Sequence, residues 1–200
     1  YSMSYKQNEG AFLAGVLAAS ATKSDMEYAN EDNVIGFVGA KDTAAVINDS
    51  AVGFIEGAQF VDPDVKVLVS YVGSYVDSAT AKELAITQYS NGADVVFVAA
   101  GPASVGVIEA AAESKKYCIG VDSDQYAQYI DSETPQKAEV ILTSMLKEVG
   151  TSFVSLFHSI EEGDDSMWGT TTVLGLAEDS VGYVDNEFFQ TNVPEELRNQ

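Results

Sequence analysis

Two carboxylates, Asp122 and Asp124, directly follow an apolar run over residues 117–121. Ligands of open parallel sheets bind beyond the carboxyl ends of the strands. If the run is a strand, it delivers both carboxylates to that edge, where a carboxylate can accept hydrogen bonds from a vicinal diol or a ring N–H. The alternative is that Asp122 or Asp124 only caps the turn that follows. The pattern alone favours neither interpretation.

A glycine-rich turn and a lysine are predicted to lie near the same edge. Residues 101–106 (GPASVG) have the glycine spacing of a phosphate loop, but Val107 stands where the lysine should follow, and Pro102 removes a backbone donor. We interpret the stretch as a sharp turn from a strand into a helix, with its backbone exposed to the cleft. Lys147 follows residues 142–145 (LTSM), and the start of a helix there would place its ammonium near the edge; the alternative is an ordinary surface lysine.

Residues suited to catalysis or metal binding do not cluster in the sequence. The single histidine, His158, falls on the polar side of a predicted helix beside an acidic loop, so no nucleophile and base pair can be assembled around it. Cys118 lies in an apolar run and is predicted to be a small buried side chain. The acidic residues 161–165 lack the alternating ligand spacing of a calcium loop. We therefore expect no enzymatic activity, no metal site and no cofactor.

Four apolar runs, each mostly continuous, are predicted to be the strands that position these residues. Continuous runs are typical of strands covered on both faces of a parallel sheet, and segments with helical spacing separate them. The runs span residues 34–39, 65–73, 94–101 and 117–122, with helices predicted over 43–60, 77–91 and 103–116. Asp77 is a predicted N-cap, and Gly92 is a predicted stop. This alternation predicts an α/β fold, a doubly wound and mostly parallel sheet with helices on both faces.

The flanking segments do not follow the alternation. A helix over residues 8–21 precedes the first strand, and a helix over 145–160 follows the apolar stretch at 140–144. Residues 170–176 and 181–185 are predicted to be two short strands joined by a tight turn. Pro194 would suit the first turn of one more helix.

We divide the chain into three parts on these grounds. Residues 1–33 are predicted to form a hinge helix and linker between lobes, residues 34–145 an α/β ligand-binding lobe, and residues 146–200 a return helix, a β-hairpin and an incomplete C-terminal segment.

The charge balance disfavours anionic partners. The chain has 31 acidic and 10 basic residues, a formal net charge of −21. Such a field repels nucleic acid and anionic membrane surfaces, and few cations are available to neutralise the phosphates of a nucleotide. We expect a neutral ligand and no nucleic-acid partner. The sequence contains no apolar stretch long enough to span a bilayer and no signal peptide, and because it begins at Tyr1 without a methionine we expect a cut or mature piece.

Several segments, in order across nearly the whole chain, closely resemble the basic membrane lipoprotein family, whose best-known members are purine nucleoside-binding lipoproteins. They are residues 5–19 (YKQNEGAFLAGVLAA), 34–40 (VIGFVGA), 53–58 (GFIEGA), 71–77 (YVGSYVD), 91–101, 119–125 (IGVDSDQ) and 142–147 (LTSMLK). The resemblance implies a type I periplasmic-binding-protein fold, in which a hinge joins two α/β lobes and the ligand lies between them. It also implies an ABC importer as partner and an extracytoplasmic location, with a lipid anchor that this chain does not contain.

The resemblance also implies roles for five residues. Glu9 would reach the ligand from the interlobe helix, although an acid in a first helical turn is also favourable by itself. Phe97 would stack on the purine, unless it is a core residue of its strand. Gly101 would contact the sugar through its backbone, and Asp122 and Lys147 would bind the ribose hydroxyls.

Two departures from the family pattern limit the comparison. Family members have roughly another domain, on the order of 100 residues, ahead of Tyr1, so this chain resembles mainly the second lobe. Pro102 and Ala103 replace a Gly-Thr-Gly-like stretch at the sugar contact.

The predicted function is the solute-binding component of an ABC importer that captures nucleosides, with purines favoured. The alternative is a cytoplasmic flavodoxin-like or response-regulator-like α/β domain, which could be an enzyme. The helix ahead of the first strand and the Asp122 and Lys147 pair favour the binding protein.

Overall fold

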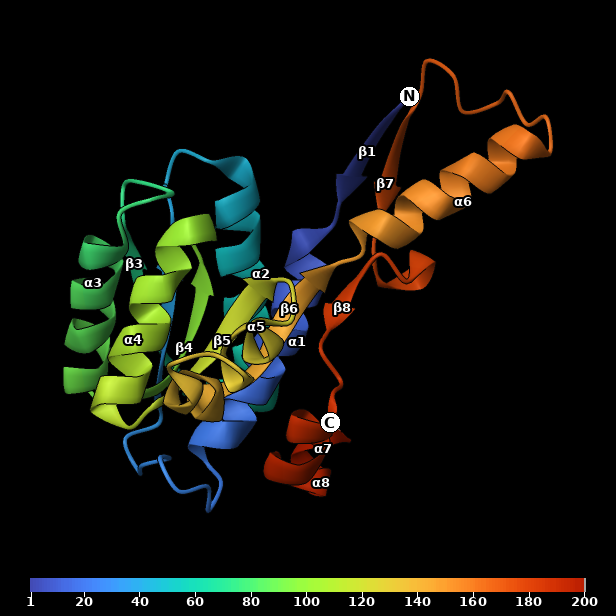
Figure 1. The fold of residues 1–200 in the computed structure, drawn as a ribbon. Helices are drawn as coiled ribbons and strands as arrows, with labels where there is room; N and C mark the ends of the chain where they lie inside the picture. The colour runs from blue at the N-terminus through green and yellow to red at the C-terminus, as the bar shows by residue number, and fades with distance from the viewer. Residues whose placement is uncertain (200) are drawn as a thin grey trace.

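A six-stranded sheet with strand order β3-β2-β4-β5-β6-β8 forms the centre of the molecule, and the computed structural model describes residues 1–199 (Figure 1). Its first five strands are parallel, and β8 pairs antiparallel with β6. The strands are β2 (Val34–Gly39), β3 (Lys66–Tyr71), β4 (Ala93–Ala99), β5 (Tyr117–Asp122), β6 (Ile141–Lys147) and β8 (Val181–Tyr183). The predicted doubly wound α/β fold is confirmed.

Two pairs of helices cover the sheet, α1 with α2 on one face and α3 with α4 on the other (Figure 1). They are α1 (Gln7–Thr22), α2 (Ala45–Val61), α3 (Ser78–Ser90) and α4 (Ser104–Ser114), all close to the predicted ranges. The predicted N-cap is also present, since Thr80 donates its backbone N–H to Asp77 Oδ1 at 3.0 Å.

Glycines let α1 and α2 approach until their backbones touch. A Cβ on Gly15 would lie 2.1 Å from the Phe54 carbonyl oxygen, and one on Gly57 would lie 2.0 Å from the Phe12 carbonyl oxygen. Any larger side chain at either position would force the helices apart. The contact fixes α1, which precedes the first strand of the main sheet, firmly onto the lobe.

Aromatic rings form the centre of the core between the sheet and α2. The ring centroid of Phe97 lies 5.7 Å from that of Phe37 and 5.4 Å from that of Phe54, and all three side chains are fully buried. Cys118 is buried in β5, as predicted. Burial of such rings contributes strongly to stability, so the lobe has a substantial core of its own.

The predicted hairpin of residues 170–176 and 181–185 is wrong. The first strand, β7 (Thr171–Leu174), pairs in parallel with β1 (Ser2–Tyr5) at the N-terminus, whereas β8 pairs with β6. The connection between them contains the 3-10 turn η3 (Leu176–Glu178) and a left-handed residue, Asp179. The two strands therefore do not pair with each other, and each pairs with a strand that is not its neighbour in sequence.

The helix predicted over residues 145–160 begins four residues later, as α6 (Val149–Glu161). Residues 145–147 instead extend β6, because Leu146 pairs with both Asp122 of β5 and Gly182 of β8. Pairing on both sides outweighs the helical spacing of the side chains. His158 is exposed on α6, as predicted.

The helix α6 and the β1–β7 ribbon project away from the main sheet (Figure 1). The apolar side of α6 is uncovered among residues 1–199, with Phe153, Val154 and Phe157 about half exposed or more. None of the helices in this range combines the length and hydrophobicity needed to cross a bilayer.

The remaining helices are short. They are α5 (Gln125–Ile130), α7 (Glu187–Asn192) and α8 (Glu195–Arg198), with the 3-10 segments η1 (Gly101–Ala103) and η2 (Pro135–Val140). The helix predicted at Pro194 corresponds to α8, which Pro194 precedes as the N-cap residue.

Candidate ligand-binding site

Asp122 and Lys147 form an ion pair at the carboxyl ends of neighbouring strands. Asp122 ends β5 and Lys147 ends β6, and Lys147 Nζ lies 2.7 Å from Asp122 Oδ1. The Asp122 side chain is 48% exposed and that of Lys147 is 25% exposed. The structure therefore brings together the two residues that the sequence suggested as a pair, although Lys147 reaches the edge from a strand and not from a helix.

Asp122 has a backbone conformation that non-glycine residues rarely adopt. Its φ angle is +71°, and the Ser123 N–H donates to the Val121 carbonyl oxygen at 2.9 Å. A positive φ with a hydrogen bond across one residue describes a γ-turn, which is strained. Such strain persists only where the surroundings enforce it, and it is concentrated at functional sites.

The two carboxylates of this stretch have different roles. Asp124 caps α5, since the Ala127 N–H donates to its Oδ1 at 3.1 Å, and its Oδ2 accepts from Asn186 Nδ2 at 3.0 Å. The capping alternative is thus correct for Asp124. Among residues 1–199, the Asp122 carboxylate caps no helix, and it contacts Lys147 at the end of β5.

Gly101 lies at the end of β4, where the structure supports the predicted sharp turn. Its φ angle is +56°, and it opens the 3-10 turn η1, which leads directly into α4. The loop after β3 crosses the end of β2, because Gly73 donates to the Ala40 carbonyl oxygen at 2.7 Å, and it reaches η1, where Ala103 donates to the Tyr75 carbonyl oxygen at 2.9 Å. The ends of β2 and β4 flank the point where the strand order reverses, the usual ligand position in this class of sheet.

Tyr75 is a candidate that the sequence interpretation did not single out. Its side chain is 38% exposed, its ring lies beside Gly101, and Lys41 Nζ is 5.7 Å from the ring centroid. The signal was present, because Tyr75 falls within residues 71–77, one of the segments that carry the family resemblance. An aromatic side chain in a loop that follows a strand lies beyond the carboxyl end of that strand, where ligands of parallel sheets bind.

Phe97 does not lie at this edge. Its side chain is fully buried among Phe37 and Phe54, and it has no exposed face with which to stack on a ligand. The structure thus agrees with the core interpretation of Phe97 and not with the role that the resemblance implied. Tyr75 presents a partly exposed aromatic ring near this edge.

Glu9 lies in the first turn of α1 and is held by protein partners. Its Oε2 accepts the Leu176 N–H at 2.8 Å, and its Oε1 lies 3.0 Å from Lys6 Nζ. The backbone hydrogen bond from Leu176, followed by the contact with Lys6, lowers the pKa of Glu9. Glu9 therefore ties the start of α1 to the segment after β7, and its 28% exposed side chain keeps some access to solvent.

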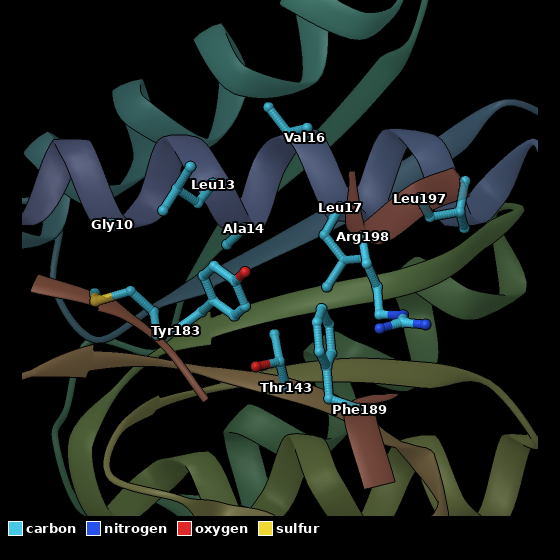
Figure 2. A pocket seen from close by; sticks show the side chains of 11 residues that line it. Gly10, Leu13, Ala14, Val16, Leu17, Thr143, Tyr183, Phe189, Leu197 and Arg198 are labelled. Atoms are coloured by element: carbon cyan, nitrogen blue, oxygen red, sulfur yellow. The ribbon is translucent and has the colours of Figure 1, made fainter. Parts of the chain in front are cut away.

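An apolar cavity lies elsewhere, between α1, the strands β6 and β8, and the C-terminal helices (Figure 2). Figure 2 shows the rings of Tyr183 and Phe189 below α1, with Leu17 and Arg198 beside them. None of the five predicted site residues lines it. Its lining offers few polar groups for a sugar or a base, so we place the candidate site at the carboxyl edge of the sheet and not here.

Comparisons with known proteins agree with this fold. The family described as "ABC transporter substrate-binding protein PnrA-like" matches residues 1–200. The chain is 34% identical over 195 residues to Basic membrane protein D of Borreliella burgdorferi (strain JD1), covering 96% of this chain and 52% of that protein. It is 36% identical over 171 residues to the ABC transporter nucleoside-binding protein BmpA of Lactococcus lactis subsp. cremoris (strain MG1363), covering 81% of this chain and 46% of that one.

Solved structures show the same fold. A solute-binding protein of an ABC transporter system from Aeropyrum pernix K1 superposes with a TM-score of 0.78 at 25% identity, covering 94% of this chain and 50% of its own. A transcriptional activator of the comK gene from Bacillus halodurans superposes with a TM-score of 0.80 at 23% identity, covering 100% and 61%, which at this identity supports the fold alone.

The chain spans about half the length of the curated relatives it matches. The match along all 200 residues confirms the resemblance and replaces the flavodoxin-like alternative, and the matched family consists of binding proteins and not of enzymes. The chain belongs to the PnrA-like family of ABC transporter substrate-binding proteins.

Proposed function

We propose that this chain provides one wall of a nucleoside-binding cleft in the solute-binding component of an ABC importer. The observation that carries the proposal is the Asp122 and Lys147 pair at the carboxyl edge of the sheet. Asp122 Oδ2 has no protein partner among residues 1–199 and can accept a hydrogen bond, while Lys147 can donate further ones. Together they match the adjacent hydroxyls of a ribose. The name of the Lactococcus relative, a nucleoside-binding protein, supports the same ligand class.

The base would lie toward the other end of the edge. Tyr75 presents a partly exposed ring beside Gly101, and aromatic rings stack favourably on planar bases. The left-handed Gly101 exposes backbone where a side chain would otherwise stand. We propose Tyr75 for stacking and Gly101 for the sugar contact; the preference for purines rests on the family resemblance.

The second wall of the cleft would belong to another lobe. The β1–β7 ribbon and α6 leave the main sheet together, as expected where a chain passes between two lobes. We propose that residues 1–33 and 146–200 contain this hinge region and that residues 34–145 form the lobe. Glu9, at the start of α1, would face the cleft from the hinge side.

The partners follow from the same proposal. The loaded protein would deliver its nucleoside to the membrane subunits of the importer, outside the cytoplasm, and a lipid anchor outside these 200 residues would hold it at the membrane.

Replacing Asp122 tests the site directly. In a two-lobed form of the protein, Asp122→Ala should raise the Kd for guanosine at least tenfold, roughly 1.4 kcal/mol, because the ribose loses its carboxylate acceptor and Lys147 loses its partner. Isothermal titration calorimetry measures the change. Asp131→Ala is the matched control, since it removes the same group from an exposed position at the end of α5. An unchanged affinity in Asp122→Ala, or an equal loss in both variants, would contradict the placement of the site.

The ligand class has a separate test. A two-lobed form should bind guanosine more tightly than guanosine monophosphate, because a chain of net charge −21 has few cations to neutralise the phosphate. Competition calorimetry at low and moderate salt compares the two ligands. Tighter binding of the monophosphate at both salt concentrations would exclude a site built for an uncharged nucleoside.

A further inference from the structure

The carbonyl oxygen of Val121 accepts two hydrogen bonds at the strained turn. One comes from the Ser123 N–H at 2.9 Å and closes the γ-turn around Asp122, and the other comes from Gln125 Nε2 at 3.1 Å. A γ-turn at a non-glycine residue is unfavourable by itself, so neighbouring groups must hold it. From the next helix, the Gln125 amide contacts the turn at the Val121 carbonyl oxygen, the acceptor of the γ-turn hydrogen bond.

Gln125 is in turn fixed to the neighbouring strand. Its backbone N–H donates to Ser144 Oγ at 3.2 Å, and the Ser144 carbonyl oxygen accepts the Val184 N–H at 2.9 Å. Ser144 is only 1% exposed and lies in β6, the strand that ends in Lys147. Gln125 thus links the turn that carries Asp122 to the strand that carries Lys147.

Gly120 leaves the space that this arrangement needs. A Cβ at position 120 would lie 2.6 Å from Gln125 Oε1 and 2.7 Å from Ser144 Oγ. The amide of Gln125 therefore fills a slot between the ends of β5 and β6, and it has little freedom to leave Val121.

We propose that Gln125 is a positioning residue for the ligand site: it holds the γ-turn so that the Asp122 carboxylate stays beside Lys147 before the ligand arrives. The inference rests on the proposed function for its consequence in binding. Without the amide, the Val121 carbonyl oxygen loses a donor, and the turn relaxes toward an ordinary backbone conformation that moves the carboxylate. Binding must then restore the turn, which lowers affinity for ligands that use Asp122.

The first measurement needs no ligand. In the free two-lobed protein, Gln125→Leu should speed hydrogen exchange of the Ser123 N–H at least tenfold, measured by NMR, because the γ-turn hydrogen bond opens more often. Gln128→Leu is the matched control, because it removes an amide from the same helix. The Gln128 amide donates to Ser123 Oγ at 2.8 Å and not to the Val121 carbonyl oxygen. Equal exchange rates in Gln125→Leu and the unmodified protein would overturn the proposal.

The second measurement separates positioning from general destabilisation. Gln125→Leu should weaken guanosine binding about tenfold and change binding of 2′,3′-dideoxyguanosine less than twofold, because the latter has no diol for Asp122. In an Asp122→Ala background, Gln125→Leu should have less than a twofold effect. Equal losses for both nucleosides, or a full additional loss in the Asp122→Ala background, would overturn a role through Asp122.

The proposed function and the role of Gln125 can fail independently of each other. If the unmodified two-lobed protein binds no nucleoside, the proposed function fails, while the exchange measurement still decides whether Gln125 holds the turn. If Gln125→Leu does not fold, Ser144→Ala removes the anchor of Gln125 and should speed Ser123 exchange in the same direction; an unchanged rate in that variant would overturn the proposal.

Discussion

The 200-residue chain alone should bind guanosine with a Kd of about 1 mM or weaker, and a two-lobed form should bind it at least a hundredfold more tightly, about 2.7 kcal/mol. Hydrogen bonds to charged groups contribute about 1.5–3 kcal/mol each, and the edge described here offers Asp122 and Lys147 for this purpose. That gain is offset by the several kcal/mol lost when a free ligand is immobilised. A second lobe would add contacts to the base and exclude water from the whole cleft.

The comparison requires two methods because the affinities differ so widely. Guanosine and inosine are titrated into the isotope-labelled chain by NMR and into the two-lobed form by calorimetry. Thermal unfolding of the chain provides the control that it is folded during the titration. Micromolar binding by the chain alone would show that residues 1–199 already contain a complete site, contrary to the division into two lobes.

Gly57→Ala should lower the free energy of unfolding by about 2–3 kcal/mol and the Tm by roughly 4–12 °C. The added Cβ would lie 2.0 Å from the Phe12 carbonyl oxygen, so α1 and α2 must separate along their contact. The backbone atoms of α1 and α2 cannot rotate out of the contact, as the end of a flexible side chain could. Because Glu9 lies in the first turn of α1, displacement of this helix would also disturb Glu9 and the hinge side of the proposed cleft.

Gly150→Ala is the matched control for this variant. Gly150 lies in the exposed helix α6, and a Cβ there would meet no atom within 4 Å. The same chemical change should therefore be neutral or stabilise the protein by up to about 1 kcal/mol, as expected from helix propensity. Chemical denaturation with urea measures both variants. Equal stability of Gly57→Ala and the unmodified protein would show that the two helices are not in backbone contact.

The centre of the main sheet could be predicted from the sequence because β2, β4 and β5 are buried on both faces. Continuous apolar runs such as residues 34–39 and 95–99 leave little choice of structure, and the helices between them carry clear signals, among them the N-cap Asp77. The strands at the margin gave no such signal. β1 has the sequence SMSY with alternating exposure, and its partner β7 lies at the other end of the chain, so only the fold reveals the pairing.

The candidate site was predictable in part. The Asp122 and Lys147 pair followed from the predicted strand end at Asp122 and from the family resemblance, and the structure places the two side chains in contact, with Lys147 at the end of a strand where a helix start was expected. Whether the ring of Phe97 points into the core or to the edge depends on the sheet around its strand, which the sequence does not show, whereas Tyr75 lies in the loop that follows β3. The sequence also could not reveal the positive φ of Asp122, since an Asp-Ser-Asp stretch is compatible with ordinary turns as well.

The pairing of β1 with β7 implies an order of events during folding. Among β2 to β6, paired residues such as Val95 and Tyr117, or Phe37 and Phe97, lie much closer in sequence than the residues that the ribbon joins, so these contacts can form earlier. The ribbon instead joins residues 2–5 to residues 171–174 and closes a loop that contains the whole lobe. The entropic cost of that closure is high for a disordered chain and much lower once the lobe has folded. We therefore expect the ribbon to assemble last and to open first, while the lobe stays folded.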